Sequence, residues 1–202
     1  MKIELSSDVK TWFTSDNHFG HKNIIHHCDR PVSDVIEMES WLINKLKSKI
    51  QPEDIVIHTG DFLFSKDKLY EAEFKRIVEL LPGSWMFVPG NHDDKYIDIM
   101  TRALEGTRHK VLEHYVEAKY NKRLLIICHY PFRNWKNSRV GSINIHGHEH
   151  GSNTNIVKNQ IDVGIDAIPG NVPILLDDLI LQVDNMDGEL ISHHEGQKTG
   201  KD

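Results

Sequence analysis

Five short apolar runs, each followed at once by a polar cluster, constrain this chain more than any other feature. Each run is four or five residues long, rich in branched or aromatic side chains, and is ended by Gly, Asp, Asn or His. This pattern predicts buried strands over residues 11–15, 55–59, 86–89, 124–128 and 143–146. Amphipathic stretches predict helices over residues 33–50, 68–81 and 96–104. Strands alternating with helices indicate an α/β protein with parallel strands in its first half.

The half of the chain beyond residue 111 is richer in strands. Turn-forming residues at Asn121-Lys122 and over residues 185–188 predict turns there, and we expect the later strands to return antiparallel. The fold class that follows is a layered α/β sandwich. Ser33 is the predicted N-cap of the first helix, and Pro82-Gly83 is the predicted end of the second.

Composition places the chain among ordinary globular proteins. It has 202 residues, 39% hydrophobic and 27% charged, with no internal repeat or long linker, so we expect one domain over residues 1–195 and a polar tail over residues 196–202. No apolar stretch approaches the roughly eighteen residues of a membrane span, and the first residues lack a signal-peptide core. Cys28 and Cys128 are the only cysteines, which fits a reduced compartment and a cytoplasmic location.

The net charge argues against nucleic acid as a partner, and the histidine content points to metal binding. Proteins that grip nucleic acid through its phosphates are usually basic, whereas the net charge here is −6. Nucleic acid is therefore left open as a partner but is not favoured. Fourteen histidines are many for a chain of 202 residues, and imidazole is the commonest metal ligand in proteins.

Histidines, acids and an amide collect at the ends of the predicted strands. The five clusters are Asp16-Asn17-His18, Gly60-Asp61, Gly90-Asn91-His92-Asp93, His129 and Gly147-His148-Glu149-His150. In open α/β sheets, ligands bind beyond the carboxyl ends of the strands, so these clusters should meet at one rim. The predicted metal ligands are Asp16, His18, Asp61, Asn91, His129, His148 and His150.

The types of ligand indicate the chemistry. Imidazole and carboxylate together suit zinc, iron, nickel or manganese, and seven ligands suit two metals that share a bridging carboxylate. Two dications offset by two carboxylates leave a charge of about +2, or about +1 with a bridging hydroxide, and such a centre attracts a phosphate ester. Gly60, Gly90 and Gly147 precede ligands, where the lack of a Cβ lets the backbone approach the metals closely.

The order of the motifs resembles that of the calcineurin-like metallophosphoesterase superfamily. Asp-x-His, Gly-Asp, Gly-Asn-His-Asp, a lone His and Gly-His-x-His follow one another from Asp16 to His150 in the family's order. Residues 14–25, residues 162–166 and Pro173-Ile174 resemble a branch of small bacterial and phage phosphoesterases. The resemblance implies a sandwich of two mixed β-sheets flanked by helices.

The resemblance also implies a role for each ligand position. The first metal would be held by Asp16, His18 and His150, with Asp61 bridging both metals and Asn91, His129 and His148 completing the second. Manganese is the expected metal, with iron, zinc and nickel as alternatives. Asp61 would be catalytic through its bridging position, and His92 would be the catalytic residue that protonates the leaving-group oxygen.

Two features depart from the pattern of better-known relatives. Cys128 precedes the lone histidine where many relatives have glycine, so its thiol either lies near the centre or packs in the core. The Gly-Asp motif continues Phe62-Leu63-Phe64 where protein phosphatases continue Asp-Arg-Gly, which argues against activity on phosphoserine or phosphothreonine in proteins.

Residues near the rim are candidates for substrate binding. We expect His21, Asn91 and Arg133 to bind the substrate, the alternatives being a solvated loop around His21 and a hydrophobic lid around Arg133. Arg30 is a further candidate for a phosphate contact. Asp93 is expected to orient a metal ligand.

The sequence thus predicts a dinuclear metal-dependent phosphoesterase with a single catalytic domain. A metal-bridging hydroxide would hydrolyse a small phosphoester, in the first place a phosphodiester or a nucleotide-type substrate. A phosphomonoesterase of the same superfamily is one alternative, and a metal-binding regulatory protein without catalytic activity is another. No membrane partner is expected.

Overall fold

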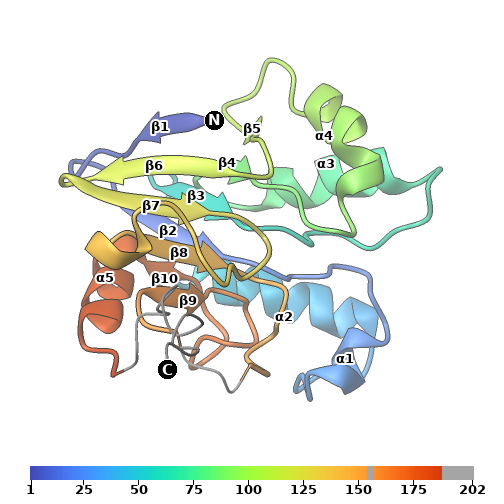
Figure 1. Ribbon diagram of the computed structural model, residues 1–202. Coiled ribbons are helices and arrows are strands. Elements are labelled where there is room, and N and C mark those ends of the chain that lie inside the picture. Colours follow the sequence, from blue (N-terminus) through green and yellow to red (C-terminus); the bar gives the residue numbers. More distant parts are fainter. Residues whose placement is uncertain (154–156, 188–202) are drawn as a thin grey trace, which may run out of the picture.

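Two five-stranded β-sheets form the centre of the molecule in Figure 1, a computed structural model that describes residues 1–153 and 157–187. The first sheet has the strand order β10-β2-β3-β4-β5, and the second has the order β1-β6-β7-β8-β9. The strands are β1 (Lys2–Glu4), β2 (Thr11–Thr14), β3 (Ile55–His58), β4 (Ser84–Phe87), β5 (Lys110–Val111), β6 (Val116–Tyr120), β7 (Arg123–Ile127), β8 (Ile143–His146), β9 (Gln160–Asp162) and β10 (Ile174–Leu175). The helices are α1 (Ile24–His27), α2 (Val35–Lys47), α3 (Tyr70–Leu80), α4 (Ile97–Ala103) and α5 (Leu176–Asp184), with 3-10 turns η1 (Asp94–Tyr96) and η2 (Ser138–Val140).

The first sheet confirms the predicted parallel strands. β2, β3, β4 and β5 run parallel, in a register that places Phe13 beside Ile57 and Ile57 beside Met86, whereas β10 joins β2 antiparallel. Helix α2 connects β2 to β3, and helix α3 connects β3 to β4. The carboxyl ends of these strands therefore lie at one edge of the sheet.

The second sheet departs from the predicted antiparallel return. Among its described strands only β6 and β7 pair antiparallel, joined by Asn121 and Lys122 with φ angles of 46° and 67°, the left-handed two-residue turn that suits a hairpin. β1 joins β6, β8 joins β7 and β9 joins β8 in parallel. Because β7 and β8 run parallel, the residues that follow them meet, and the Gly147 N–H donates to the His129 carbonyl at 3.0 Å.

Apolar side chains fill two layers, one between the sheets and one between the first sheet and the helices. Side chains alternate along a strand, so Phe13 and Ile57 point into the inner layer, while Val56 and Trp85 point into the helix layer. Phe74 of α3 packs in the helix layer. Figure 1 shows α1 to α4 gathered on one side of the sheets and α5 on the other. This arrangement confirms the predicted α/β sandwich of two mixed sheets flanked by helices.

Helix boundaries agree with the sequence in part. The two later helices occur as α3 and α4, slightly shorter than predicted. The first predicted helix occurs as α2 and begins after Ser33, because the Asp34 carboxylate is the N-cap and accepts from the N–H groups of Ile36 and Glu37. The Ser33 hydroxyl donates to the Glu37 carboxylate instead. Helices α1 and α5 were not predicted, since α1 has four residues and α5 lies where strands were expected.

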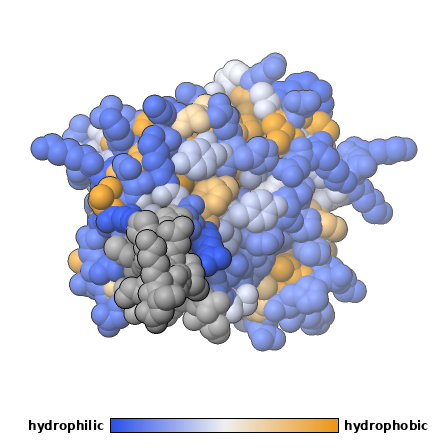
Figure 2. All heavy atoms as spheres, viewed as in Figure 1, coloured by the Kyte–Doolittle hydropathy of each residue, from blue (hydrophilic) through white to orange (hydrophobic). Residues whose placement is uncertain are grey.

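The surface shows hydrophobic side chains only in small, separate areas on the face drawn in Figure 2. No helix among residues 1–153 and 157–187 is long and apolar enough to cross a membrane. The predicted boundary at residue 195 and the tail over residues 196–202 lie outside the described residues, as does the end of the turn predicted over residues 185–188.

Helix α2 offers a matched test of the helix layer. Leu42 is 0% exposed and Ile36 is 78% exposed on the same helix. We expect Leu42→Ala to lower the free energy of unfolding by about 2–5 kcal/mol, because it removes buried methyl groups and leaves a cavity. Ile36→Ala should change it by less than about 0.5 kcal/mol. Urea titration followed by circular dichroism measures both; equal losses would contradict the assigned layer.

Candidate metal centre

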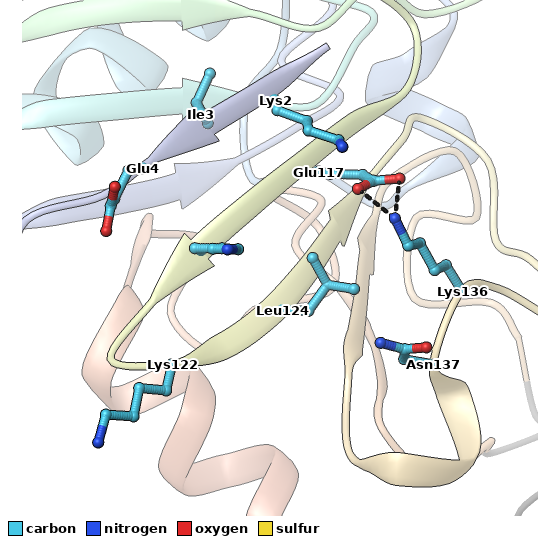
Figure 3. A pocket seen from close by; sticks show the side chains of 9 residues that line it. Lys2, Ile3, Glu4, Glu117, Lys122, Leu124, Lys136 and Asn137 are labelled. Carbon is cyan, nitrogen blue, oxygen red and sulfur yellow. Dashed lines mark hydrogen bonds and ion pairs between the residues drawn. The ribbon is translucent and has the colours of Figure 1, made fainter.

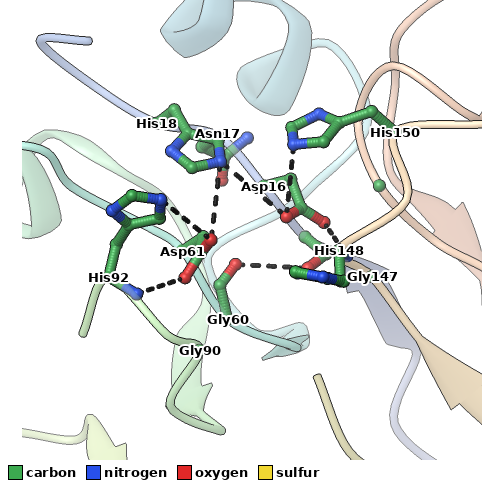
Figure 4. Close-up of polar contacts among 12 residues, drawn as sticks. Asp16, Asn17, His18, Gly60, Asp61, Gly90, His92, Gly147, His148 and His150 are labelled. Atoms are coloured by element: carbon green, nitrogen blue, oxygen red, sulfur yellow. Dashed lines mark hydrogen bonds and ion pairs between the residues drawn. The ribbon is translucent and has the colours of Figure 1, made fainter. Parts of the chain in front are cut away.

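The seven predicted ligands lie together where five strands end. Asp16 and His18 follow β2, Asp61 follows β3, and Asn91 follows β4 by a short loop. From the second sheet, the residues that follow β7 and β8 reach the same place, and they are His129, His148 and His150. Figure 4 shows the rings of His18 and His150 turned toward the carboxylates of Asp16 and Asp61. Convergence of the strand ends is thus what the sequence predicted.

One set of donor atoms surrounds Asp16. The Asp16 Oδ1 atom lies 3.9 Å from His18 Nε2 and 3.7 Å from His150 Nε2. The His18 Nε2 atom also lies 3.6 Å from Asp61 Oδ2. Asp16, His18 and His150 each offer a ligand atom within 4.8 Å of the others, and two imidazole nitrogens with a carboxylate oxygen form a donor set that a divalent transition metal accepts.

A second set of donor atoms lies on the other side of Asp61. His129 Nε2 is 3.5 Å from Asp61 Oδ2 and 3.0 Å from Asn91 Oδ1, and His148 Nδ1 is 3.1 Å from the same amide oxygen. The His129 Nδ1–H donates to the Thr59 carbonyl at 2.8 Å, so Nε2 faces this set, where a neutral ring would offer its lone pair to a cation. An amide oxygen, a carboxylate oxygen and two ring nitrogens that converge in this way are a donor set suited to a divalent cation.

The electrostatics of the cluster favour positive charge. The Asp16 Oδ1 atom is buried without a hydrogen-bond partner among the described residues, and burial raises the pKa of Asp16 to about 6. Burial lowers the pKa of His129, but the carboxylates of Asp61 and Asp16 outweigh it and raise that pKa to about 9. Burial raises the pKa of Asp61, whereas hydrogen bonding and charge from His129 and His18 bring it below its usual value. The residues present therefore fit bound divalent metal ions.

The backbone conformation at most of the predicted ligands sets the direction of their side chains. Five of the seven predicted ligands have left-handed φ angles, which are rare for residues other than glycine. They are Asp16 at 56°, His18 at 50°, Asp61 at 59°, His148 at 73° and His150 at 49°. Each such residue costs about 1–3 kcal/mol, and such strain clusters at functional sites. Reversing the chain direction directly after each strand is what turns these donors inward.

Asp93 fastens the ends of β3 and β4 together. Its buried carboxylate accepts from the N–H groups of Asp61 at 2.7 Å, Gly90 at 3.0 Å and Phe62 at 3.4 Å. A Cβ at Gly90 would overlap the Asp61 carboxylate, and a Cβ at Gly147 would overlap Ser15 and Asp16. The close approach predicted for these glycines is present, and Asp93 positions the Asp61 loop through its backbone.

Arg30 takes a position that the sequence did not predict. Its guanidinium is buried, donates to the carbonyls of Asp16 and Asn17 at 2.8 and 2.7 Å, and pairs with Asp166 at 2.8 Å. Arg30 is therefore neither a phosphate contact nor part of a solvated loop. Asp166 in turn lies 2.9 Å from His150 Nδ1, and a carboxylate in that place orients the ring so that Nε2 faces Asp16. Nothing in the spacing of Asp166 indicated this contact.

The other predicted site residues divide into two groups. His92 and His21 lie at the rim, since the His92 ring is 5.2 Å and the His21 ring 5.4 Å from the His18 ring, and His92 Nε2 is 3.9 Å from Asp61 Oδ2. Arg133 is exposed and lines a separate small hollow with Trp135 and Lys158, so the structure does not bring it into the cluster.

Two residues beside His129 were left open by the sequence. Cys128 is buried and burial raises the pKa of its thiol, which favours the uncharged packing role over a reactive one. Tyr130 is exposed at the rim, and its ring lies 5.1 Å from the His129 ring and 4.8 Å from the His148 ring.

A larger hollow lies over β1, β6 and β7, as Figure 3 shows. It has a volume of about 630 Å³ and is lined mainly by lysines and glutamates, of which Lys136 and Glu117 pair at 2.7 Å. None of the predicted site residues lines it, and it holds no histidine or aspartate. The chemistry-bearing side chains therefore belong to the rim of strand ends rather than to this hollow.

Relatives of known sequence and structure resemble the chain over most of its length. The uncharacterized protein MJ1445 of Methanocaldococcus jannaschii is 33% identical over 174 residues, which cover 83% of this chain and 88% of that protein. The gene 66 protein of Mycobacterium phage L5 is 29% identical over 181 residues, covering 78% and 86% respectively. The crystal structure of AQ665, a protein of unknown function from Aquifex aeolicus, has the same fold, with a TM-score of 0.62 at 20% identity over 86% of this chain and 99% of that chain.

The family model of the calcineurin-like phosphoesterases matches residues 9–198, which include every predicted ligand. The phage relative confirms the predicted resemblance to the small bacterial and phage branch. The chain therefore belongs to the calcineurin-like phosphoesterases, a family of metal-dependent hydrolases that act on phosphoesters.

Proposed function

We propose that this protein is a dinuclear metallophosphoesterase that hydrolyses phosphodiesters or nucleotide-type substrates. One observation carries the proposal: the Asp61 carboxylate lies between two separate sets of donor atoms. Asp61 Oδ2 is 3.6 Å from His18 Nε2 on one side and 3.5 Å from His129 Nε2 on the other. A carboxylate shared in this way is the bridge that a two-metal site needs.

The proposed ligands divide as the family resemblance implies. Asp16, His18 and His150 would hold one ion, Asn91, His129 and His148 the other, and Asp61 both. When bound, two divalent ions supply a hydroxide nucleophile at neutral pH and neutralise charge that develops on the phosphoryl oxygens. The donor set suits manganese, iron, zinc or nickel, and we take manganese as the working choice.

His92 is the proposed proton donor to the leaving group. Its side chain is 37% exposed, so substrate can reach it, and its backbone N–H donates to Asp61 Oδ1 at 2.9 Å. In hydrolysis water adds to phosphorus, the P–O bond to the alcohol breaks, and the alcohol oxygen gains a proton. A histidine at the rim can deliver that proton while the buried ring of His18 cannot meet the solvent-side oxygen.

Exposure of the rim supports diesters over monoesters. Asn91 and His148 are exposed, so both ester groups of a diester have room to project away from the centre. Phosphomonoester hydrolysis is the second candidate in the same chemistry. A regulatory protein without catalysis is disfavoured because every proposed ligand and His92 are in place at the strand ends.

The direct test compares two chromogenic esters. We expect the metal-free protein to be inactive, and manganese to restore hydrolysis of bis(p-nitrophenyl) phosphate at a higher kcat/KM than that of p-nitrophenyl phosphate. Release of nitrophenolate measures both rates. A higher kcat/KM for the monoester would replace the diester assignment, and inactivity on both esters with two ions bound per chain would support the regulatory alternative.

If the Asp61 carboxylate binds both metal ions, removing its charge should weaken the binding of both. Asp61→Asn should lower the bound metal from two ions per chain and reduce kcat/KM by more than about 100-fold, since even residues that only orient metal ligands cost about 10–100-fold. Elemental analysis of the purified protein measures the metal. Asp98→Asn makes the same charge change at an exposed site and should leave both quantities unchanged. Two ions and full turnover in Asp61→Asn would refute the bridge.

If His92 protonates the leaving group, the loss of rate on removing His92 should depend on how readily the leaving group departs without a proton. His92→Ala should keep both ions but slow hydrolysis of alkyl esters by about 10²–10⁴-fold, because the departing alkoxide needs a proton. Hydrolysis of nitrophenyl esters should slow much less, since nitrophenolate leaves without one. His26→Ala, at an exposed site on α1, is the control. Loss of metal from His92→Ala would identify His92 as a ligand instead.

A further inference from the structure

Exposed aromatic rings are concentrated at the candidate centre. Among the described residues, eight large hydrophobic side chains are exposed, and only two of them are aromatic, Phe64 at 45% and Tyr130 at 43%. Both lie against the cluster: Phe64 beside His21 and His92, and Tyr130 beside His129 and His148. An exposed aromatic ring costs free energy in water, so two at one rim point to a ligand that covers them.

Phe64 lies on the same side of the candidate metal centre as His92. Its ring stacks on the His21 ring at 4.3 Å and meets the His92 ring edge-on at 5.6 Å. In an in-line displacement the leaving group departs opposite the attacking oxygen, and the residue that protonates it marks its side. Phe64 is therefore next to the place where the leaving alcohol would emerge.

A pocket opens directly beside these rings. It has a volume of about 300 Å³ and is lined by Phe64, Asn91, His92 and Tyr96 among others. This volume is at the lower end of the range for small-molecule sites, so it takes one ring-bearing group rather than an oligomer. The lining also includes the polar side chains of Asp94 and Lys95, which can meet polar atoms at the edge of a planar ligand.

The pocket wall is held in place by polar and aromatic contacts. The Tyr96 hydroxyl donates to Asp67 Oδ1 at 2.5 Å and lies 3.2 Å from the Ser65 carbonyl, and Lys95 Nζ donates to the same Asp67 oxygen at 2.9 Å. The Tyr96 ring stacks on the buried Tyr70 ring at 3.6 Å. The segment that carries Phe64 is thus fastened before any ligand arrives, which lowers the entropic cost of binding.

We propose that Phe64 is the specificity-determining residue of this centre and that its pocket binds the leaving group of the substrate. The ligand is an alcohol that carries a planar ring, of the size and polarity of one nucleoside. The substrate class is then phosphodiesters with a nucleoside as leaving group. This inference rests on the proposed function for its chemistry, and on the exposed ring and its pocket for its specificity.

The test compares a substrate with a ring in the leaving group and one without. For Phe64→Ala we expect kcat/KM for the deoxydinucleotide d(ApA) to fall by about 5–150-fold, mainly through KM, as stacking of one base on an aromatic ring is worth about 1–3 kcal/mol. For bis(2,2,2-trifluoroethyl) phosphate the change should stay within about twofold. Phe64→Trp should restore the d(ApA) value, and Leu181→Ala, which removes an exposed side chain on α5, should change neither.

A binding measurement separates this inference from the proposed function. Titration calorimetry of 2′-deoxyadenosine into the manganese-loaded protein should show binding that weakens about tenfold or more in Phe64→Ala, whether or not the protein is a catalyst. If the wild type hydrolyses neither ester but binds the nucleoside through Phe64, the proposed function fails and the pocket stands. If Phe64→Ala slows both esters equally, or leaves nucleoside binding unchanged, the inference is overturned while the proposed function stands.

Discussion

The carboxylate of Asp61 is the contact on which the two donor sets depend. Its Oδ2 atom faces three imidazole nitrogens, those of His18, His129 and His92, at 3.6, 3.5 and 3.9 Å. Its Oδ1 atom accepts the His92 backbone N–H at 2.9 Å, which fixes the orientation of the carboxylate plane. A buried carboxylate is costly unless positive charge is close by. The one side chain thus explains both why the rings gather and why the residues fit metal ions.

A small number of buried polar contacts stabilise the strained, left-handed backbone at the candidate site. Left-handed φ angles at Asp16 and Asp61 cost about 1–3 kcal/mol each. Two groups that do not belong to the donor sets hold those turns. The Arg30 guanidinium binds the Asp16 carbonyl, and the Asp93 carboxylate binds the Asp61 N–H. Because both contacts go to backbone atoms, they fix the turn without competing for the donor atoms of the site.

The sequence predicted the features that depend on residues next to one another in the chain. It did not predict the contacts between residues that are far apart in the chain. Short apolar runs followed by Asp61 or His129 indicate both a strand and a polar side chain at its end, so the rim could be predicted from the strand ends. The parallel pairing of β8 with β7 and β9 could not be predicted, since the direction of a strand depends on how the chain crosses over to reach it and not on the pattern within the strand. The roles of Arg30 and Asp166 were missed for the same reason: the two residues are 136 positions apart, and only the folded chain brings them together.

The loop after Asp61 holds a carboxylate in place and presents an aromatic ring within three residues. Phe62 is buried in the helix layer, whereas Phe64 turns outward. Backbone bonds fix this change of direction: the Phe19 N–H donates to the Phe62 carbonyl at 3.0 Å, and the Phe64 N–H donates to the Phe19 carbonyl at 2.9 Å. Main-chain contacts therefore set the position of the Phe64 backbone relative to Asp61, and the ring lies against His21 and His92. Under the proposed function, a substitution at Phe64 would change what lies beside the leaving group while the Asp61 carboxylate stays where it is, which would separate the control of specificity from the control of chemistry.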